Sequence, residues 1–328
     1  MFQSSLQHLK RLGLAAAIGV ALSSTAAHAD SSFSGPIRLI VPYAPGGGAI
    51  DLTARALQKP LQKELGTRVI VENKPGGSTK IGTMAVMNAP PDGQTLIIVS
   101  HPGWVGYYYS KIFDEKPWEQ MTPLAQVAES PYSVITVKAN GRFSSWADVV
   151  AWAKAHPDQP IKAGAPAAGG FTQLAFNQIL KNTGIKGTFV PYAGAGQAKA
   201  ALLGGEIDIQ MESGQAFLGI RNGLTKGIAV SSPGRFPLQN DIPTYAELKI
   251  GDTLPTNGFS VWGPKGMKPD VVKKLVDALH AASKDKSLIE LLQDKNAILV
   301  HFEDGPTISA ETKDVDKTWG DRLKTVAP

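Results

Sequence analysis

The residues with the most definite chemistry in this sequence lie in a glycine-rich loop near its start. Gly46, Gly47 and Gly48 follow a short apolar run and precede a stretch with helical periodicity. A strand that leads into a helix through glycines leaves the first backbone N–H groups of the helix without intrahelical partners. Those N–H groups, together with the helix dipole, attract a carboxylate or a phosphate. We interpret the loop as a site for a small organic acid, although the glycines could also serve only a tight turn.

Asp51, just inside the following helix, has two roles that the sequence does not separate. Its carboxylate could cap the helix by accepting a hydrogen bond from a backbone N–H group. Alternatively, it could bind an amine or a hydroxyl group of a ligand. An ionised aspartate beside a bound carboxylate is repulsive, so a plain diacid ligand would favour the capping role.

The sequence lacks the motifs of the common exported hydrolases. It contains no G-x-S-x-G elbow, no H-E-x-x-H pair and no cysteine. Its six histidines are scattered, and none pairs with a candidate nucleophile or has the spacing of a metal ligand. We therefore predict that the protein is not an enzyme and needs no metal or other cofactor. An exported hydrolase is the rival class.

The first 29 residues have the features of a secretion signal. Lys10 and Arg11 form a positive start, Leu12 to Leu22 an apolar core, and Ala27 to Ala29 a small-residue cleavage site. A membrane anchor is the alternative, but the apolar core is too short to span a bilayer. We predict that residues 1–29 are a signal peptide, cleaved after Ala29.

The composition of the 328-residue chain allows one large domain or two ordinary domains. Hydrophobic residues make up 43% of the chain, enough for a large core, and without cysteine no disulfide can form. The formal net charge is +5, but no dense run of Lys and Arg occurs. We therefore predict no nucleic-acid partner.

Strand and helix patterns alternate along the chain and would position the loop. In the first part, apolar runs at 37–41, 69–71 and 96–99 predict strands, and helices follow the glycine loop and cover 78–89. Pro60 predicts a kink in the first helix, and Gly66 predicts its end. This alternation indicates a parallel sheet covered on both faces.

The alternation repeats in the rest of the chain. Further strands are predicted at 133–137, 161–163, 189–194, 207–211, 228–230, 259–262 and 298–302. Helices are predicted after Ser145, after Gly170, at 197–203, from Pro269, around 288–292 and at 310–323. A second small-residue loop, 165–170, follows the strand at 161–163. The sequence therefore predicts two similar α/β units, and a cleft between two such units commonly binds a small molecule.

Five segments in series resemble the solute receptors of tripartite tricarboxylate transporters, also called Bug proteins. The segments are VPYAPGGGAIDLTAR (41–55), VIVENKPGG (69–77), PPDGQTLII (90–98), VPYAGAGQAKAALLGGEIDI (190–209) and Arg235…Asp241-Ile242-Pro243-Thr244…Glu247. One glycine motif alone would be weak, but five in the same order are specific. Two features depart from the family pattern. The spacing from Pro42 to Asp51 is one residue longer than usual, and no histidine follows Gly169-Gly170.

The resemblance implies a periplasmic-binding-protein-like α/β fold of type II, a Venus flytrap with a ligand cleft between two domains. With the chain crossing near Pro131 and Gly251, one domain comprises 30–131 plus 252–328, and the other 132–251. The family implies a monomeric periplasmic receptor that binds a small organic carboxylate and delivers it to the membrane permease of such a transporter. A receptor that signals to a sensor kinase is the alternative.

The resemblance also implies which residues contact the ligand. In the first domain these are Tyr43, Ala44, Pro45, Gly46, Gly47, Gly48 and Asp51, with Ser100 and His101 after the third strand. In the second domain these are Ala165, Ala167, Gly169, Gly170, Thr172, Tyr192 and Ala193.

Several neighbouring residues have a plainer interpretation. Tyr107, Tyr108 and Tyr109 could line an aromatic pocket, but core packing explains them better. Glu72 and Asn73 are interpreted as turn residues.

Overall fold

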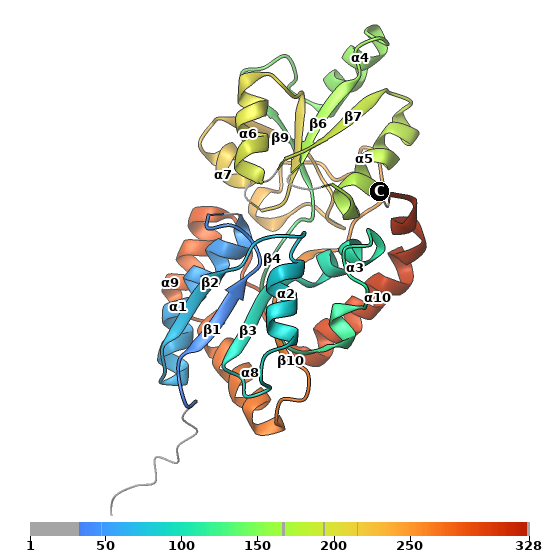
Figure 1. Ribbon diagram of the computed structural model, residues 1–328. Coiled ribbons are helices and arrows are strands. Elements are labelled where there is room, and N and C mark those ends of the chain that lie inside the picture. The colour runs from blue at the N-terminus through green and yellow to red at the C-terminus, as the bar shows by residue number, and fades with distance from the viewer. Residues whose placement is uncertain (1–32, 47, 166–167, 193, 215, 327–328) are drawn as a thin grey trace, which may run out of the picture. The chain divides into compact units, whose positions relative to one another are not determined.

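Two β-sheets, each covered by helices, organise the chain (Figure 1). The computed structural model describes residues 33–46, 48–165, 168–192, 194–214 and 216–326. The predicted signal peptide lies outside these residues. Residues 33–328 form one compact unit. No helix within the described ranges is long and apolar enough to cross a membrane.

The first sheet has six strands in the order β11-β4-β10-β3-β1-β2. Their bounds are β1 (Ile37–Val41), β2 (Val69–Asn73), β3 (Thr95–Ser100), β4 (Met121–Ser130), β10 (Asn257–Pro264) and β11 (Glu303–Asp304). β1 runs parallel to β2 and β3, as the sequence predicts, but β10 runs antiparallel to both β3 and β4. The sheet is therefore mixed rather than parallel, because β10 returns to it from the second sheet in the opposite direction.

Helices cover both faces of the first sheet (Figure 1). They are α1 (Ala49–Leu65), α2 (Lys80–Met87), α3 (His101–Tyr109), η1 (Pro117–Glu119), α8 (Pro269–Ser283), α9 (Lys286–Ile289) with the π turn η3 (Glu290–Asp294), α10 (Gly305–Leu323) and η4 (Lys324–Val326). Leu39 packs with α1, α8 and α9 on one face, and the next residue, Ile40, packs with α2, α3 and α10 on the other. Alternate strand residues thus enter separate cores, as expected of a sheet buried on both sides.

The second sheet has five strands in the order β7-β6-β8-β5-β9. Its elements are β5 (Val134–Lys138), α4 (Trp146–Ala155), β6 (Ile161–Ala165), α5 (Gly170–Thr183), β7 (Gly187–Pro191), α6 (Ala195–Gly204), β8 (Ile209–Glu212), α7 (Ala216–Arg221), β9 (Thr225–Val230) and η2 (Pro237–Gln239). β6 runs parallel to β7 and β8, and β5 is antiparallel to β8 and β9. Ser145 caps α4 in a capping box with Asp148, as its residue type predicts.

The chain passes between the sheets twice. It leaves the first sheet after Ser130 and enters the second at Val134, and it returns after Val230 to β10 at Asn257. The strands of the first sheet therefore come from two segments of the chain, 37–130 and 257–304, and those of the second sheet come from the segment between them, 134–230. The domain boundaries at 131 and 251 stay a prediction.

The structure corrects several predicted elements. Gly66 ends α1 in the left-handed conformation, as predicted, and the kink at Pro60, which lies inside α1, stays a prediction. Glu72 and Asn73, predicted as turn residues, are instead the last two residues of β2, because they pair with β1. The predicted strand at 298–302 is wrong: Leu299 forms only an isolated bridge to Glu129, and regular pairing is confined to β11. The sequence also missed α3, whose glycines and aromatics lack a helical apolar pattern, and β4, which contains Pro123.

Candidate functional site

A buried carboxylate holds the glycine loop that follows β1. The backbone N–H of Gly46 donates to Oδ2 of Asp51 at 2.8 Å, and the amide of Asn73 donates to Oδ1 at 2.7 Å. The same amide donates to the carbonyl of Tyr43 at 2.9 Å. Arg55, one turn along α1, donates to Oδ2 at 3.0 Å. The end of β2 and the first turn of α1 therefore clamp the loop from both sides.

Asp51 is neither the usual cap of α1 nor a free side chain. It is 2% exposed, and the residue in the cap position is Gly48, which has no side chain to bond. Burial raises the pKa of Asp51, but the hydrogen bonds from Arg55, Asn73 and Gly46 outweigh burial, so its pKa is lowered. Because both oxygens accept hydrogen bonds from protein groups, Asp51 sets the shape of the loop. Asn73, interpreted from sequence as a turn residue, belongs to the same network.

The backbone conformation explains the glycines of the loop. Gly46 has φ 69° and Gly48 has φ 125°, and a Cβ atom at either position would meet nothing within 4 Å. Glycine is therefore needed for the left-handed conformation rather than for space. Ala44, Pro45 and Gly46 are exposed, whereas Gly47 lies outside the described residues.

The second small-residue loop is built in the same way after β6. Gly169, at φ 79°, donates its N–H to Oε1 of Gln173 at 2.7 Å, a side chain from the first turns of α5. The N–H of Gly170 donates to Oγ of Ser110 at 3.2 Å, at the end of α3. A Cβ atom on Gly106 of α3 would lie 3.2 Å from Cα of Gly170. The loop of the second sheet is therefore in close contact with a helix of the first.

The remaining predicted residues of the second sheet lie around this loop. Ala165 is fully buried at the end of β6, and Thr172 is half-buried on α5. Tyr192 follows β7 and packs its ring over Gly164. Ala167 and Ala193 lie outside the part of the chain that the structure describes.

Ser100 and His101 have protein partners of their own. Oγ of Ser100 accepts from the N–H of Gly103 at 3.1 Å and so caps α3. His101 is 2% exposed, with Nδ1 3.1 Å from Oγ of Ser260 and Nε2 3.6 Å from a carboxylate oxygen of Glu311. Its side chain therefore belongs to a separate pocket.

A cluster of tyrosines links the two loops. Tyr43 forms a side-chain hydrogen bond with Tyr107 of α3, and Tyr132 interacts electrostatically with both. The ring of Tyr132 packs edge-on against Phe171 of α5, with ring centroids 5.0 Å apart. Of these three residues, the sequence analysis predicted only Tyr43 as a site residue. The three tyrosines come from distant segments, so no local pattern shows that they meet. The aromatic run at 107–109 was the one sequence signal for Tyr107.

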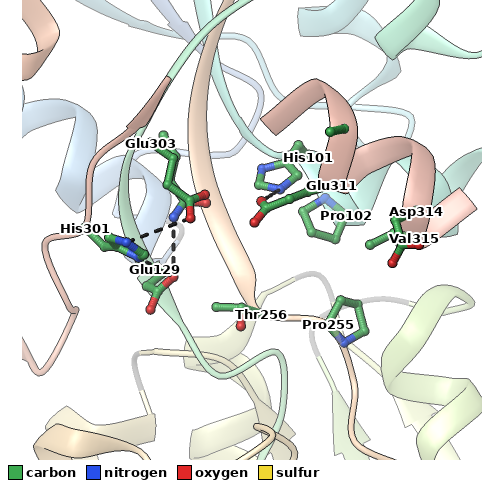
Figure 2. A pocket seen from close by; sticks show the side chains of 12 residues that line it. His101, Pro102, Glu129, Pro255, Thr256, His301, Glu303, Glu311, Asp314 and Val315 are labelled. Carbon is green, nitrogen blue, oxygen red and sulfur yellow. Dashed lines mark hydrogen bonds and ion pairs between the residues drawn. The ribbon is translucent and has the colours of Figure 1, made fainter. Parts of the chain in front are cut away.

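The separate pocket, the His–Glu pocket, has a volume of about 630 Å³ (Figure 2). It is lined by His101, Pro102, Gln126, Glu129, Pro255, Thr256, His301, Glu303, Ala310, Glu311, Asp314 and Val315. Figure 2 shows His301, Glu303 and Glu129 together, with His101 beside Glu311. No group of three acidic or histidine side chains in the described ranges is arranged to hold a metal ion.

The charged groups of the His–Glu pocket shift the pKa values of one another. Nδ1 of His301 lies 3.1 Å from a carboxylate oxygen of Glu129, and Nε2 lies 3.8 Å from one of Glu303. Burial lowers the pKa of His301, but the carboxylates of Glu129, Glu303 and Glu311 outweigh burial and raise it. Burial and the charge of Glu311 raise the pKa of Glu303 to about 7. The neighbouring imidazole of His101, 3.6 Å away, lowers the pKa of Glu311. Of the two carboxyl groups Glu303 and Glu311, Glu303 is therefore the one that holds a proton near neutral pH.

Glu303→Gln should stabilise the protein at alkaline pH. The folded pKa of Glu303 is about 7, above the value of roughly 4.3 for a free glutamate. The protonated form of Glu303 therefore stabilises the folded protein fully below the pKa of the unfolded state, and this stabilisation is lost as pH rises through 7. Glutamine removes that loss, so the melting temperature of the variant relative to the wild type should rise by about 2 °C between pH 5 and pH 8.

Thermal unfolding across this pH range checks the prediction, with the exposed Glu115→Gln as the control. A difference between Glu303→Gln and wild type that is constant with pH would contradict it.

Comparison with known proteins places this architecture among transport receptors. Residues 53–317 match the family described as the tripartite tricarboxylate transporter family receptor. The chain is 31% identical over 272 residues to protein BugT of Bordetella pertussis, covering 82% of both chains.

Two solved structures share the fold. The periplasmic binding protein BugD has a TM-score of 0.77 at 26% identity, with 89% of this chain and 98% of BugD covered. A Rhodopseudomonas palustris protein, Rpa4515 with adipate, has a TM-score of 0.78 at 23% identity, with 90% and 99% covered. Both sheets with their helices thus correspond to a periplasmic-binding-protein fold.

Proposed function

The chain belongs to the tripartite tricarboxylate transporter receptor family, and we propose that it captures a small organic carboxylate between its two sheets. This family consists of substrate-binding receptors, not enzymes. The receptor would deliver its ligand to the membrane permease of a tripartite tricarboxylate-type transporter. It would act as a monomer in the periplasm after cleavage of residues 1–29.

One observation carries the proposal: two glycine loops of the same construction lie at the carboxyl ends of β1 and β6. In each loop a glycine N–H is fixed by a side chain of the following helix, Asp51 for Gly46 and Gln173 for Gly169. The helices that begin at these loops, α1 and α5, have 17 and 14 residues, so each N-terminus carries a helix dipole. Such paired helix starts suit an anionic ligand held by backbone groups.

The contact between α3 and α5 supports a cleft that closes on the ligand. Gly170 bonds to Ser110 across this contact, and Gly214, in the loop after β8, approaches Ala49 at the start of α1. A ligand that touches both loops would favour the closed arrangement by its differential affinity for it. We assign residues 30–131 and 252–328 to one domain of this cleft and residues 132–251 to the other.

We propose the backbones of the two loops as the carboxylate contacts. The set comprises residues 44–48, 165–170 and 193, with Tyr43, Thr172 and Tyr192 as nearby side chains. Asp51 would position the first loop. We leave out Ser100 and His101, because Ser100 caps α3 and His101 bonds to Ser260 and faces Glu311. The adipate in the similar R. palustris structure is consistent with a carboxylate ligand.

The proposal is tested by expressing the full chain and recovering the protein from the periplasmic fraction. Its intact mass should correspond to a chain that begins at Asp30. A panel of mono-, di- and tricarboxylates is then screened by thermal unfolding. A ligand present at about 100 times its Kd should stabilise the native state by about 2.7 kcal/mol, which raises the melting temperature by several degrees. If no carboxylate in the panel changes the melting temperature, the proposed function is wrong.

A further inference from the structure

The tyrosine cluster, Tyr43, Tyr107 and Tyr132, is a polar group of side chains beside the carboxylate loops. Its members come from the loop after β1, from α3 and from the crossing between β4 and β5. Tyr43 also belongs to the glycine loop, since its carbonyl accepts from Asn73. Tyr132 contacts Phe171 at the start of α5. The cluster therefore lies beside the first loop and reaches the helix that follows the second.

The three hydroxyls are neutral. Burial, the largest cause, raises the pKa of each phenol above its ordinary value, and for Tyr43 the neighbouring Tyr107 and Tyr132 raise the pKa further. Tyr43 and Tyr107 bond to one another. Each side chain is only half-buried, so part of the cluster is accessible to a ligand.

The charged side chains near the loop are engaged elsewhere. The guanidinium of Arg55 bonds to Asp51 and Asn73. Across the described ranges, no lysine, arginine or carboxylate side chain bonds to a hydroxyl of the cluster. After burial, the causes that raise the pKa of Tyr43 and of Tyr132 are neighbouring tyrosines. A ligand group placed here therefore meets phenol hydroxyls and aromatic rings, without a cation to balance a negative charge.

We propose that the tyrosine cluster selects ligands whose non-carboxylate end is uncharged, namely monocarboxylates with a hydroxyl, carbonyl or aromatic end. This inference rests on the proposed function, which places one carboxylate at the glycine loops. Burying a second carboxylate would require compensating charges or several donors. The cluster offers few free donors, because one hydroxyl hydrogen is already used between Tyr43 and Tyr107. A hydroxyl or carbonyl group needs only one or two such partners, and an aromatic ring packs well against Tyr132 and Phe171.

Matched pairs of acids test the selection on the protein recovered from the periplasm. Affinities are measured by calorimetry for 4-hydroxybenzoate against terephthalate and for 6-hydroxyhexanoate against adipate, within the wider carboxylate panel. The tightest ligand of the panel should be a monoacid with an uncharged end, at least tenfold tighter than the analogue that carries a carboxylate there. A diacid or triacid as the tightest ligand overturns the inference and leaves the proposed function intact. No binding by any acid overturns both.

Removing hydroxyls tests the residues themselves. Tyr107→Phe and Tyr132→Phe should each weaken the tightest hydroxy or oxo acid by about tenfold, as expected for one lost hydrogen bond, and leave its deoxy analogue unchanged. If the tightest acid has only an aromatic end, Tyr132→Ala should weaken it by about tenfold instead. The control is Tyr109→Phe, whose hydroxyl bonds to Asp316 away from the cluster. Equal effects of the cluster and control variants would overturn the assignment.

Discussion

Asp51→Ala should weaken binding of the carboxylate found by the thermal screen at least 100-fold and lower the melting temperature by about 4 °C. The substitution leaves the N–H of Gly46, the amide of Asn73 and the guanidinium of Arg55 without their acceptor. A buried group that loses its partner costs about 1 to 3 kcal/mol. Arg55 is 46% exposed and Gly46 is exposed as well, so both regain water, and we expect a total of about 2 kcal/mol, mainly from the amide of Asn73. Without the clamp the loop no longer presents its N–H groups in one geometry, and affinity should fall at least 100-fold.

The isosteric Asp51→Asn is the matched control, because it keeps one acceptor oxygen and removes the charge. Its losses should lie between wild type and alanine. The pKa of Asp51 is lowered in the folded state, so its stabilisation is present above the unfolded value of roughly 3.9 and is lost as pH falls through the folded value. The difference in melting temperature between wild type and Asp51→Ala should therefore shrink below pH 4. Full ligand affinity in Asp51→Ala would contradict the positioning role.

Gly106→Val should separate α3 from α5 and weaken ligand binding at least tenfold. A Cβ atom at Gly106 would lie 3.2 Å from Cα of Gly170 and 3.5 Å from a ring carbon of Phe171. The nearest atom belongs to the backbone, so it cannot rotate away, and the branched side chain of valine extends further still. Closing the cleft on the ligand then brings the valine side chain against α5. About 1.4 kcal/mol of strain in the closed state corresponds to a tenfold loss of ligand affinity.

The control for Gly106→Val is Gly204→Val, at the exposed end of α6, where a Cβ atom meets nothing within 4 Å. Calorimetry measures ligand affinity, and small-angle scattering measures the radius of gyration with and without ligand. The Gly106 variant should stay more expanded than wild type at equal ligand concentration. Wild-type affinity in this variant would show that the contact between α3 and α5 plays no part in closure.

The sequence by itself determined the local features of this protein. Short-range rules act within a few residues, so the strands at 37–41 and 69–71, the stop at Gly66 and the cap at Ser145 could be predicted, whereas the extension of the second strand to Asn73 could not. The two small-residue loops could also be predicted, because glycine at the end of a strand indicates a backbone conformation that residues with a Cβ atom rarely adopt. The same local order of motifs identified the family.

The tertiary structure decided which side chains meet. Asp51 finds Asn73 through the pairing of β1 with β2, and Tyr43, Tyr107 and Tyr132 converge from three segments. His101, predicted beside the loops, instead bonds to Ser260 of β10 and approaches Glu311 of α10. The antiparallel direction of β10 is likewise set by the path of the chain, which comes back to the first sheet from the second, and not by the residues of β10 itself. Partners such as these lie up to 210 residues apart, and their meeting depends on the packing of the whole fold rather than on any local pattern.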